Sequence, residues 1–362
     1  MKKIVHVLTD TNVGGAGIWL LNFLKSFRCN GYDIVVVLPR DAELVKRVKE
    51  IGIKVREVED IADKSLSLKG IFRLKKVFSE ERPDIVHSHA SLSARIAARM
   101  CKIKTINTRH CLEDAKTGIK KAVHSFINNN LSDLVIGVSA VTCKNLVDCG
   151  TKEDKVRLVY NGVFPLLKYD DEKRAFIKEK YNIKSDACVV GIVARLEDTK
   201  NHKLFIDAAE LILKEEKETM FLIVGGGSLE KELKEYAAKK GISDKVIFTG
   251  YLSDVTEAMN IIDINTLTSK KEALSISLIE GMSIRLPAVS TNSGGPAEVV
   301  ENGVNGFLVE NENSRAFADA VLELIRNPEK RELMGIEAEK TARETFSPEA
   351  MVMRLERVYK EV

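Results

Sequence analysis

Short apolar runs alternate with amphipathic stretches along the first half of the chain. The runs are rich in Val and Ile, as in strands buried on both faces of a parallel sheet. They lie at Lys3–Leu8, Asp33–Leu38, Asp84–His87, Thr105–Thr108 and Leu134–Val138. Between them, apolar residues recur at helical spacing over Ala16–Phe27, Leu66–Phe78, Ser91–Cys101 and Ile119–Asn130. This alternation predicts a doubly wound α/β sheet.

The same alternation restarts in the second half. Strands are predicted at Ala187–Val193, Met220–Val224, Lys245–Thr249, Ile262–Leu267 and Ala288–Ser290. Helices are predicted at Lys168–Asn182, Lys203–Leu213, Ser228–Lys240, Ser275–Ser283 and Ser314–Arg326. Asn161-Gly162 marks a turn before Pro165, and Ser347-Pro348 ends one helix and begins another. We therefore predict domains at 1–164 and 165–346, followed by a C-terminal helix at 347–362.

Ligands of open parallel sheets bind beyond the carboxyl ends of the strands. Two such sheets are therefore expected to face one another across a cleft, with the chemistry in the loops that follow the strands. The candidate motifs described below all follow predicted strands.

Size and composition fit this organisation. A chain of 362 residues is long for a single core, and 44% hydrophobic with 30% charged residues is ordinary for a globular protein. No apolar run approaches the roughly 18–20 residues that span a bilayer, and the N-terminus turns polar too soon for a signal peptide. The cysteines form no C-x-x-C pair and are expected to be reduced and buried in a cytoplasmic protein; they are Cys29, Cys101, Cys111, Cys143, Cys149 and Cys188.

The net charge of +3 is the balance of two unlike halves. Residues 1–160 contain 28 Lys and Arg against 18 Asp and Glu, whereas the remaining residues contain 28 against 35. A basic N-terminal half is suited to peripheral contact with the anionic inner face of the cell membrane. Lysines that merely solvate outer helix faces explain the charge equally well. The basic stretches lack interleaved aromatic residues, so nucleic-acid binding is not expected.

Two acids mark the C-terminal third. Glu272 is expected in a loop before a helix, and Glu280 lies within that helix among apolar residues. Carboxylates accept paired hydrogen bonds from vicinal hydroxyls, and a buried acid is costly without a partner. Phosphate oxygens can bind backbone N–H groups at the helix start, here those of Ala273, Leu274 and Ser275. The segment therefore suits a sugar nucleotide.

Two cations, Arg195 and Lys200, follow the first strand of the second domain. Breaking a sugar–diphosphate bond leaves negative charge on the departing nucleotide, and fixed cations stabilise that charge in the transition state. One charge pair at 4 Å contributes about 4 kcal/mol at an effective dielectric of 20, which corresponds to about a thousandfold in rate.

Glycine-rich loops follow two other strands. Gly14-Gly15 precedes the first helix and allows a phosphate to approach backbone amides, although such a pair is more often only a tight turn. Gly225-Gly226-Gly227 opens a helix, and a nucleotide contact and a simple turn explain it equally well. The first loop does not match G-x-G-x-x-G, and Leu38-Pro39-Arg40 lacks the acid that would hold a ribose, which argues against a dinucleotide-dependent oxidoreductase.

Histidines gather at two strand ends. His87 and His89 project from the same face of one strand. With no third His, Cys or acid at suitable spacing, structural roles are favoured over metal binding. His110 closes the segment Thr105–His110 at the end of the next strand.

Together these segments resemble glycosyltransferase family 4, the retaining, nucleotide-sugar-dependent enzymes of the GT-B fold, in which two Rossmann-like domains face one another across a cleft. The matching motifs are the Arg-x-x-x-x-Lys of Arg195 and Lys200, the paired-acid segment, Gly225–Gly227, and Gly294-Gly295 with Glu298. In the first domain, Thr108-Arg109-His110 is similar to the family's Thr-x-His. The resemblance covers nearly the whole chain and is more specific in the second domain. It also implies that the C-terminal helix at 347–362 crosses back to the N-terminal, acceptor-side domain.

The resemblance implies a role for each motif. Catalytic roles fall to His110, Arg195, Lys200 and Glu272. Donor binding falls to Gly14, Gly15, Gly226, Tyr251, Leu252, Ala273, Leu274, Ser275 and Glu280, with Tyr251 and Leu252 against the base and Glu280 on the ribose. His89 and Arg109 are assigned to the acceptor. No cofactor or metal is implied, because cations and helix termini can neutralise the diphosphate.

The predicted activity is transfer of a sugar from a nucleoside-diphosphate sugar to a glycan or lipid-linked hydroxyl acceptor, with retention, in cell-envelope or polysaccharide biosynthesis. One alternative is a GT-B-like epimerase that removes and restores the nucleotide of a single donor. Another is a catalytically silent sugar-nucleotide-binding subunit, against which the intact Glu272, His110, Arg195 and Lys200 argue.

Overall fold

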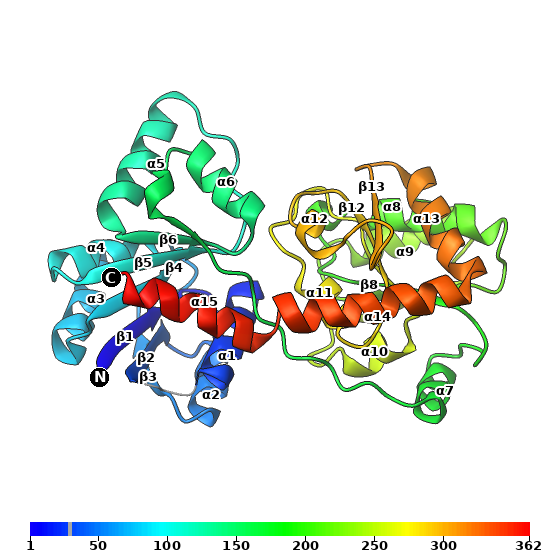
Figure 1. Cartoon of the computed structure of the whole chain (residues 1–362), viewed down its shortest axis with the longest axis horizontal. Coiled ribbons are helices and arrows are strands. Elements are labelled where there is room, and N and C mark those ends of the chain that lie inside the picture. The colour runs from blue at the N-terminus through cyan, green and yellow to red at the C-terminus, as the bar shows by residue number, and fades with distance from the viewer. Residues whose placement is uncertain (28–30) are drawn as a thin grey trace. The chain divides into compact units, whose positions relative to one another are not determined.

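The computed structural model describes residues 1–27 and 31–362 and divides the chain into two compact units (Figure 1). The N-terminal unit comprises Met1–Val163 with Ser347–Val362, and the C-terminal unit comprises Phe164–Phe346. Each unit contains one fully parallel sheet with helices, which confirms the predicted pair of Rossmann-like domains. Among the described residues, no helix is both long and apolar enough to cross a membrane.

The N-terminal unit has a seven-stranded sheet in the order β3-β2-β1-β4-β5-β6-β7. Its strands are β1 (Lys2–Val7), β2 (Tyr32–Pro39), β3 (Lys54–Val58), β4 (Ile85–His89), β5 (Lys104–Arg109), β6 (Leu134–Gly137) and β7 (Val156–Leu158). Its helices are α1 (Gly15–Ser26), α2 (Glu43–Glu50), α3 (Leu68–Glu81), α4 (Leu92–Met100), α5 (Gly118–Leu131), α6 (Ala140–Asp148), the 3-10 turn η1 (Glu153–Lys155) and α15 (Pro348–Lys360).

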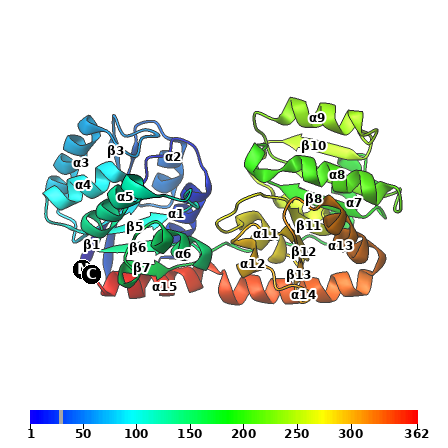
Figure 2. The same ribbon diagram turned by 90° about the horizontal axis from the view of Figure 1, so that it is seen from above.

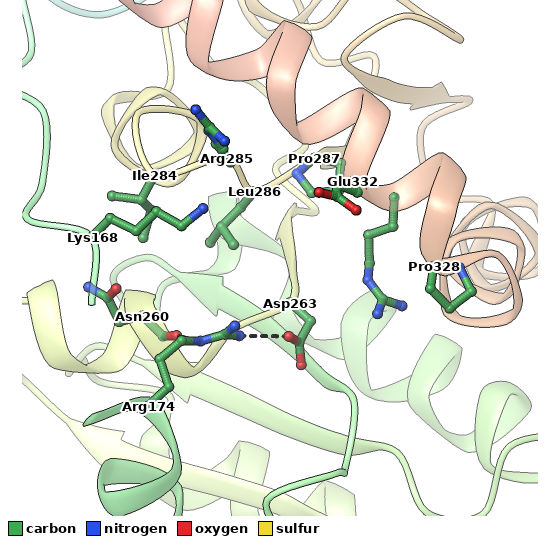
Figure 3. A pocket seen from close by; sticks show the side chains of 11 residues that line it. Lys168, Arg174, Asn260, Asp263, Ile284, Arg285, Leu286, Pro287, Pro328 and Glu332 are labelled. Atoms are coloured by element: carbon green, nitrogen blue, oxygen red, sulfur yellow. Dashed lines mark hydrogen bonds and ion pairs between the residues drawn. The ribbon is translucent and has the colours of Figure 1, made fainter. Parts of the chain in front are cut away.

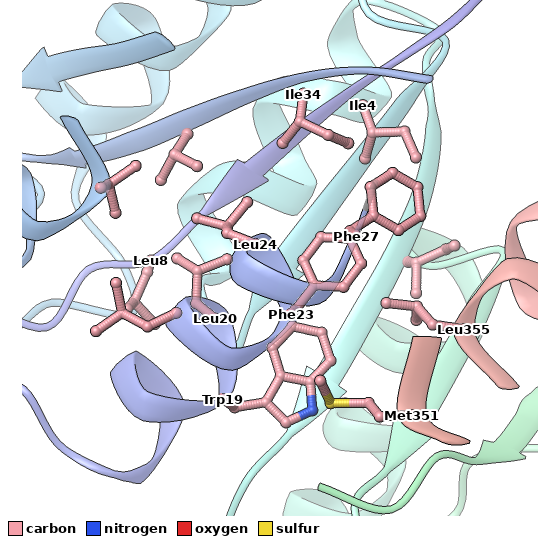
Figure 4. Packing of buried hydrophobic residues seen from close by; sticks show 14 of the residues in the cluster. Ile4, Leu8, Trp19, Leu20, Phe23, Leu24, Phe27, Ile34, Met351 and Leu355 are labelled. Carbon is pink, nitrogen blue, oxygen red and sulfur yellow. The ribbon is translucent and has the colours of Figure 1, made fainter. Parts of the chain in front are cut away.

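Alternate residues of the central strands enter two different cores. Ile4 of β1 belongs to the cluster that includes α1 and α2, whereas Val5 and Val7 belong to the cluster formed with α3 and α4. This two-sided burial is why the central strands are continuous apolar runs. Figure 4 shows Met351 and Leu355 of α15 in the first cluster, near Trp19 and Phe23 of α1. The last helix thus completes the core of the N-terminal unit.

The C-terminal unit has a six-stranded sheet in the order β10-β9-β8-β11-β12-β13 (Figure 2). Its strands are β8 (Val189–Val193), β9 (Met220–Val224), β10 (Val246–Gly250), β11 (Ile264–Leu267), β12 (Ala288–Thr291) and β13 (Gly306–Val309). Its helices are α7 (Asp171–Lys180), η2 (Asp198–Lys200), α8 (His202–Leu213), α9 (Glu230–Lys239), α10 (Thr256–Ile261), α11 (Ile276–Met282), α12 (Pro296–Val299), α13 (Ser314–Arg326) and α14 (Pro328–Thr345).

Three strands, β3, β7 and β13, are absent from the sequence-based prediction, and all three are edge strands. Several of their side chains are only partly buried, so they lack the apolar continuity by which the central strands were found.

The cysteine prediction needs correction. The described cysteines are free thiols, but only Cys149 is fully buried and Cys111 is exposed. Cys111 lies in the loop directly after β5, where the chain has left the sheet. Cys29 lies outside the described residues.

Candidate active site

Several candidate residues lie at the topological switch point of each sheet, and the others follow neighbouring strands. Strand order reverses between β1 and β4 in one unit and between β8 and β11 in the other. Chains leaving two such strands diverge to opposite faces of the sheet, which opens a crevice for ligands. Gly14 follows β1 and His89 is the last residue of β4. In the other unit, Lys200 follows β8 and Glu272 follows β11.

An ion pair joins the two switch-point loops of the C-terminal unit. Lys200 Nζ lies 2.5 Å from Glu272 Oε2, and the two side chains are 19% and 13% exposed. Ser269 Oγ donates a second hydrogen bond to the same carboxylate oxygen at 3.2 Å. A cation and an acid that are 72 positions apart in sequence are thereby held together.

Backbone bonds fasten the Glu272 loop on both sides. Thr268 Oγ1 donates to the carbonyl of Lys200 at 2.8 Å, and the Glu272 N–H donates to the carbonyl of Ser293 at 3.0 Å. The Gly295 N–H donates in turn to the Glu272 carbonyl at 2.9 Å. A Cβ atom at Gly295 would lie 2.0 Å from the Ala273 carbonyl oxygen, so this position requires glycine.

The next three residues leave backbone donors available. Ala273, Leu274 and Ser275 are buried, yet their N–H groups have no hydrogen-bond acceptor among the described residues. Ser275 caps α11, since its Oγ accepts from the Leu278 N–H at 3.3 Å. Buried N–H groups without acceptors are rare in native proteins, and three in succession are suited to an anion.

Glu280 lies on α11 in an apolar setting. Burial raises the pKa of its carboxyl to about 7, and the charge of Asp254 adds to the rise. Within the described part of the chain its carboxyl group has no cationic partner and no hydrogen bond. Since no Arg or Lys of the described residues pairs with this acid, a bound ligand is the partner that its burial favours.

The glycine segment after β9 serves backbone packing. A Cβ atom at Gly225 or Gly227 would lie 2.0 Å from the Ala194 carbonyl oxygen or 2.4 Å from that of Leu196. These glycines let the segment pack against the residues that flank Arg195. The Arg195 guanidinium is exposed and binds Glu197 at 2.6 Å, not the Lys200–Glu272 pair.

The middle glycine of this segment faces the loop after β10. A Cβ atom at Gly226 would lie 3.3 Å from that of Tyr251. The Tyr251 side chain is 69% exposed, whereas Leu252 is partly buried against the core. The exposed ring leaves the end of this loop open for contact.

In the N-terminal unit, Gly14 is the N-cap of α1 and Gly15 is its first residue. A Cβ atom at Gly14 would meet nothing within 4 Å. Packing therefore does not require this glycine, in contrast to Gly225 and Gly295.

The histidines are more numerous at this site than the sequence indicated. The expectation of no third ligand near His87 and His89 is wrong, because parallel pairing of β1 with β4 brings His6 beside them. The rings of His87 and His89 stack at 15°, and those of His6 and His89 at 20°. The ring nitrogens hydrogen-bond to one another, to Thr108, to Tyr359 and to His110, which engages the lone pairs that a metal ion would need.

Arg109 belongs to a separate charged cluster. Its guanidinium pairs with Glu113, which also binds Lys116 and, at 2.7 Å, His124. Burial opposes ionisation of Glu113, but the bonds with His124 and Lys116 and the charge of Arg109 lower its pKa to about 2. Much of the positive charge of Arg109 is therefore balanced within the protein.

A cavity of about 270 Å³ in the C-terminal unit lies elsewhere (Figure 3). Asp263, which immediately precedes β11, lines it and pairs with Arg174 at 2.8 Å. The second Asp263 oxygen accepts from the N–H of Val189, at the start of β8. The cavity is thus at the amino ends of the strands, opposite the edge that carries Lys200 and Glu272.

Two family models match the chain. The family described as glycosyl transferases group 1 matches residues 173–341, and the one described as Glycosyltransferase Family 4 matches residues 13–165. The chain belongs to glycosyltransferase family 4. It is accordingly a glycosyltransferase enzyme.

Individual relatives of this glycosyltransferase are distant but cover most of it. N-acetyl-alpha-D-glucosaminyl L-malate synthase of Bacillus anthracis is 23% identical over 100% of this chain and 98% of its own. UDP-Gal:alpha-D-GlcNAc-diphosphoundecaprenol alpha-1,3-galactosyltransferase of Escherichia coli is 27% identical over 70% of each chain. The crystal structure of Anabaena HepE with UDP-glucose covers 100% of both chains with a TM-score of 0.88 and 21% identity, which supports the GT-B fold.

One residue beside the glycosyltransferase's ion pair was not singled out from the sequence. His202, at the start of α8, is 2% exposed, and neither ring nitrogen has a partner among the described residues. Burial and the nearby Lys200 charge lower its pKa to about 4. The only sequence signal is its position directly after the Lys200 turn.

Proposed function

We propose that this glycosyltransferase transfers a sugar from a nucleoside-diphosphate sugar to a hydroxyl acceptor with retention of anomeric configuration. The observation that carries the proposal is the partly buried Lys200–Glu272 pair beside the N–H groups of Ala273, Leu274 and Ser275, which have no acceptor among the described residues. At one switch point, the cation can neutralise the diphosphate, the acid can accept hydrogen bonds from sugar hydroxyls, and the amide N–H groups can bind phosphate oxygens.

The C-terminal unit would bind the donor. Lys200 neutralises the diphosphate, with Arg195 as the second cation once it leaves Glu197. Glu272 accepts hydrogen bonds from the sugar hydroxyls, and Glu280 accepts them from the ribose. Gly226, Tyr251 and Leu252 border the base. These cations make a metal ion unnecessary in the proposal.

The N-terminal unit would serve the same reaction. The Gly14-Gly15 start of α1 contributes N–H groups to the diphosphate, and His110 contacts the donor sugar. His89 lies one hydrogen bond from His110, at 3.0 Å. Any contact of Arg109 with the acceptor must use N–H groups not engaged by Glu113.

Retention is proposed to follow a front-face substitution. The bond between the anomeric carbon and the diphosphate oxygen breaks, and the acceptor oxygen bonds the same face of that carbon. The acceptor proton passes to the departing phosphate oxygen. No protein nucleophile enters this scheme, and the Glu272 carboxylate stays with Lys200.

The acceptor is proposed to be a glycan or a lipid-linked saccharide of cell-envelope or polysaccharide biosynthesis. Support comes from the Escherichia coli relative, whose name specifies a diphosphoundecaprenol-linked acceptor. An acceptor of that kind is anchored in a membrane, which gives a reason for an enzyme to work at a bilayer surface.

Helix α5 is the proposed membrane contact. Its apolar residues Ile119, Val123 and Phe126 are 83%, 52% and 66% exposed, and only Asn128 of this helix is fully buried. They are spaced as one helical face, which we name the α5 apolar face. Lys120 and Lys121 beside it are also exposed, so apolar insertion would be combined with attraction to anionic headgroups.

The deciding experiment is a screen of UDP-, GDP- and ADP-sugars with saccharide acceptors, in which released nucleotide and the anomeric configuration of the product are measured. We expect acceptor-dependent release, an α product from an α donor, and unchanged rates with a chelator. Turnover without acceptor would favour the epimerase, whereas binding without turnover would favour the silent subunit. An inverted product would overturn retention.

A further inference from the structure

A continuous chain of buried polar groups runs through the N-terminal unit to His110. Its members come from three strands, the residue that follows the third strand, and the C-terminal helix. They are His6 of β1, His87 and His89 of β4, Thr108 of β5, His110 directly after β5, and Tyr359 of α15. Thr108 Oγ1 lies 2.7 Å from His87 Nε2, and His87 Nδ1 lies 2.8 Å from the Tyr359 hydroxyl. That hydroxyl lies 3.2 Å from His6 Nε2.

The chain continues from the other nitrogen of His6. His6 Nδ1 lies 3.2 Å from His89 Nε2, and His89 Nδ1 lies 3.0 Å from His110 Nε2. His110 Nδ1 is buried and ends the chain with no hydrogen-bond partner among the described residues. Every internal ring nitrogen is used once.

All four imidazoles are neutral. Burial lowers the pKa of His6 and of His110 to about 3, and burial together with the neighbouring histidines lowers those of His87 and His89 well below the usual value. A neutral imidazole has one N–H donor and one acceptor nitrogen. Each ring that accepts at one nitrogen must therefore donate at the other, and the whole chain points in one of two directions.

The two directions differ in what they leave unpaired. If Thr108 donates to His87, each hydrogen bond is satisfied in turn and only the His110 Nδ1–H is left over. If the direction reverses, the Thr108 hydroxyl hydrogen has no acceptor among the described residues and the His110 Nδ1 lone pair has no donor. A buried polar group without a partner is costly, so the first direction is favoured.

We propose that Thr108, His87, Tyr359, His6 and His89 are positioning residues that hold His110 as the Nδ1–H tautomer, ready to donate a hydrogen bond to a substrate oxygen. This inference rests on the proposed function for the identity of that oxygen, a hydroxyl or anionic oxygen of the donor. It also gives α15 a role beyond packing, because the Tyr359 hydroxyl links His87 to His6.

The tautomer can be measured without substrate by nitrogen NMR of ¹⁵N-histidine-labelled protein. The nitrogens of His110 are assigned from the signals lost in His110→Gln. We expect a single His110 species with the proton on Nδ1. A proton on Nε2 would overturn the proposal, whatever the enzyme's substrates prove to be.

Tyr359→Phe removes the link and keeps the ring. Either direction of the remaining His6–His89–His110 segment then leaves one bare donor and one bare acceptor, so both tautomers of His110 are expected. Tyr32→Phe is the matched control, because Tyr32 packs against Tyr359 with ring centroids 5.9 Å apart and its hydroxyl is not part of the hydrogen-bonded series. An unchanged His110 signal in folded Tyr359→Phe would overturn the proposal.

Thr108 provides a second test if Tyr359→Phe does not fold. Thr108→Val is nearly isosteric and removes the terminal donor, so it should mix the His110 tautomers, whereas Thr108→Ser should restore one. With an active donor and acceptor, Thr108→Val should lower kcat about fivefold with little change in KM. Mixed His110 tautomers with an unchanged kcat would overturn the proposed contact between His110 and the substrate. A His110 signal in Thr108→Val identical to that of the wild type would overturn the proposed series of hydrogen bonds.

Discussion

The two units use the switch point of a parallel sheet in different ways. In the C-terminal unit, charged side chains project from loops that are fixed by backbone hydrogen bonds and by glycines that permit close approach, as at Gly295. In the N-terminal unit, neutral histidines are fixed by side-chain hydrogen bonds that extend to the last helix. Charge suits a diphosphate, whereas a directed neutral donor suits a sugar hydroxyl.

The largest effect should come from the charged unit. Lys200→Ala removes the cation and leaves the Glu272 carboxylate, which keeps its hydrogen bond from Ser269, beside an anionic substrate. We expect turnover to fall about a thousandfold, from a loss of about 4 kcal/mol in the transition state, as measured by nucleotide release. Lys203→Ala is the control, since Lys203 forms an exposed pair with Glu232. Near-normal turnover of Lys200→Ala would remove the leaving-group role.

The next largest effect should come from glycine substitutions, which are expected to affect stability differently in the two units. Gly295→Ala places a Cβ atom 2.0 Å from the Ala273 carbonyl oxygen, so the Glu272 loop must shift. We expect the free energy of unfolding to fall by about 1–3 kcal/mol, as for overpacking, with loss of nucleotide binding. Gly14→Ala meets open space and should change stability by less than about 0.5 kcal/mol. Denaturant unfolding checks both, and equal losses would contradict the distinction.

Glu280 gives a pH test of the C-terminal unit. Its folded pKa of about 7 exceeds the ordinary value of 4.5, so its contribution to stability is fully present below pH 4.5 and is lost as the pH rises through 7. Glu280→Gln should therefore raise the melting temperature at pH 8 but not at pH 4.5. The same variant should weaken nucleotide binding about tenfold by calorimetry. Gains in both stability and affinity would exclude the ribose role.

The smallest effect tests a surface that only the N-terminal unit is proposed to use. Replacing Ile119 and Phe126 by Ser on the α5 apolar face should lower binding to anionic vesicles about tenfold, and wild-type binding should weaken with salt. Phe176→Ser on α7 is the control, because Phe176 is also 60% exposed. Equal loss in the control, or binding that ignores salt and anionic lipid, would contradict the proposal.

The fold was largely predictable because buried parallel strands carry their own signal. Nine of the ten predicted strands are central in their sheets, whereas three of the four edge strands, such as β3 (Lys54–Val58), were not predicted because they are half-exposed and lack that signal. The candidate donor residues were found from loops after strands, since Arg195, Lys200 and Glu272 stand in recognisable local segments. The histidine chain was not found, because His6 and Tyr359 are 353 positions apart in sequence.

The two α/β units and the order of their charged and glycine-rich loops follow from the amino-acid sequence, because apolar periodicity and turn residues act over short distances along the chain. Which of those groups meet depends on the folded arrangement of the strands. That arrangement paired Lys200 with Glu272, placed Glu280 with no cationic partner among the described residues, and joined His6, His87 and Tyr359. Those outcomes depend on sheet order and register, which bring distant segments within hydrogen-bonding distance and exclude water from the contact.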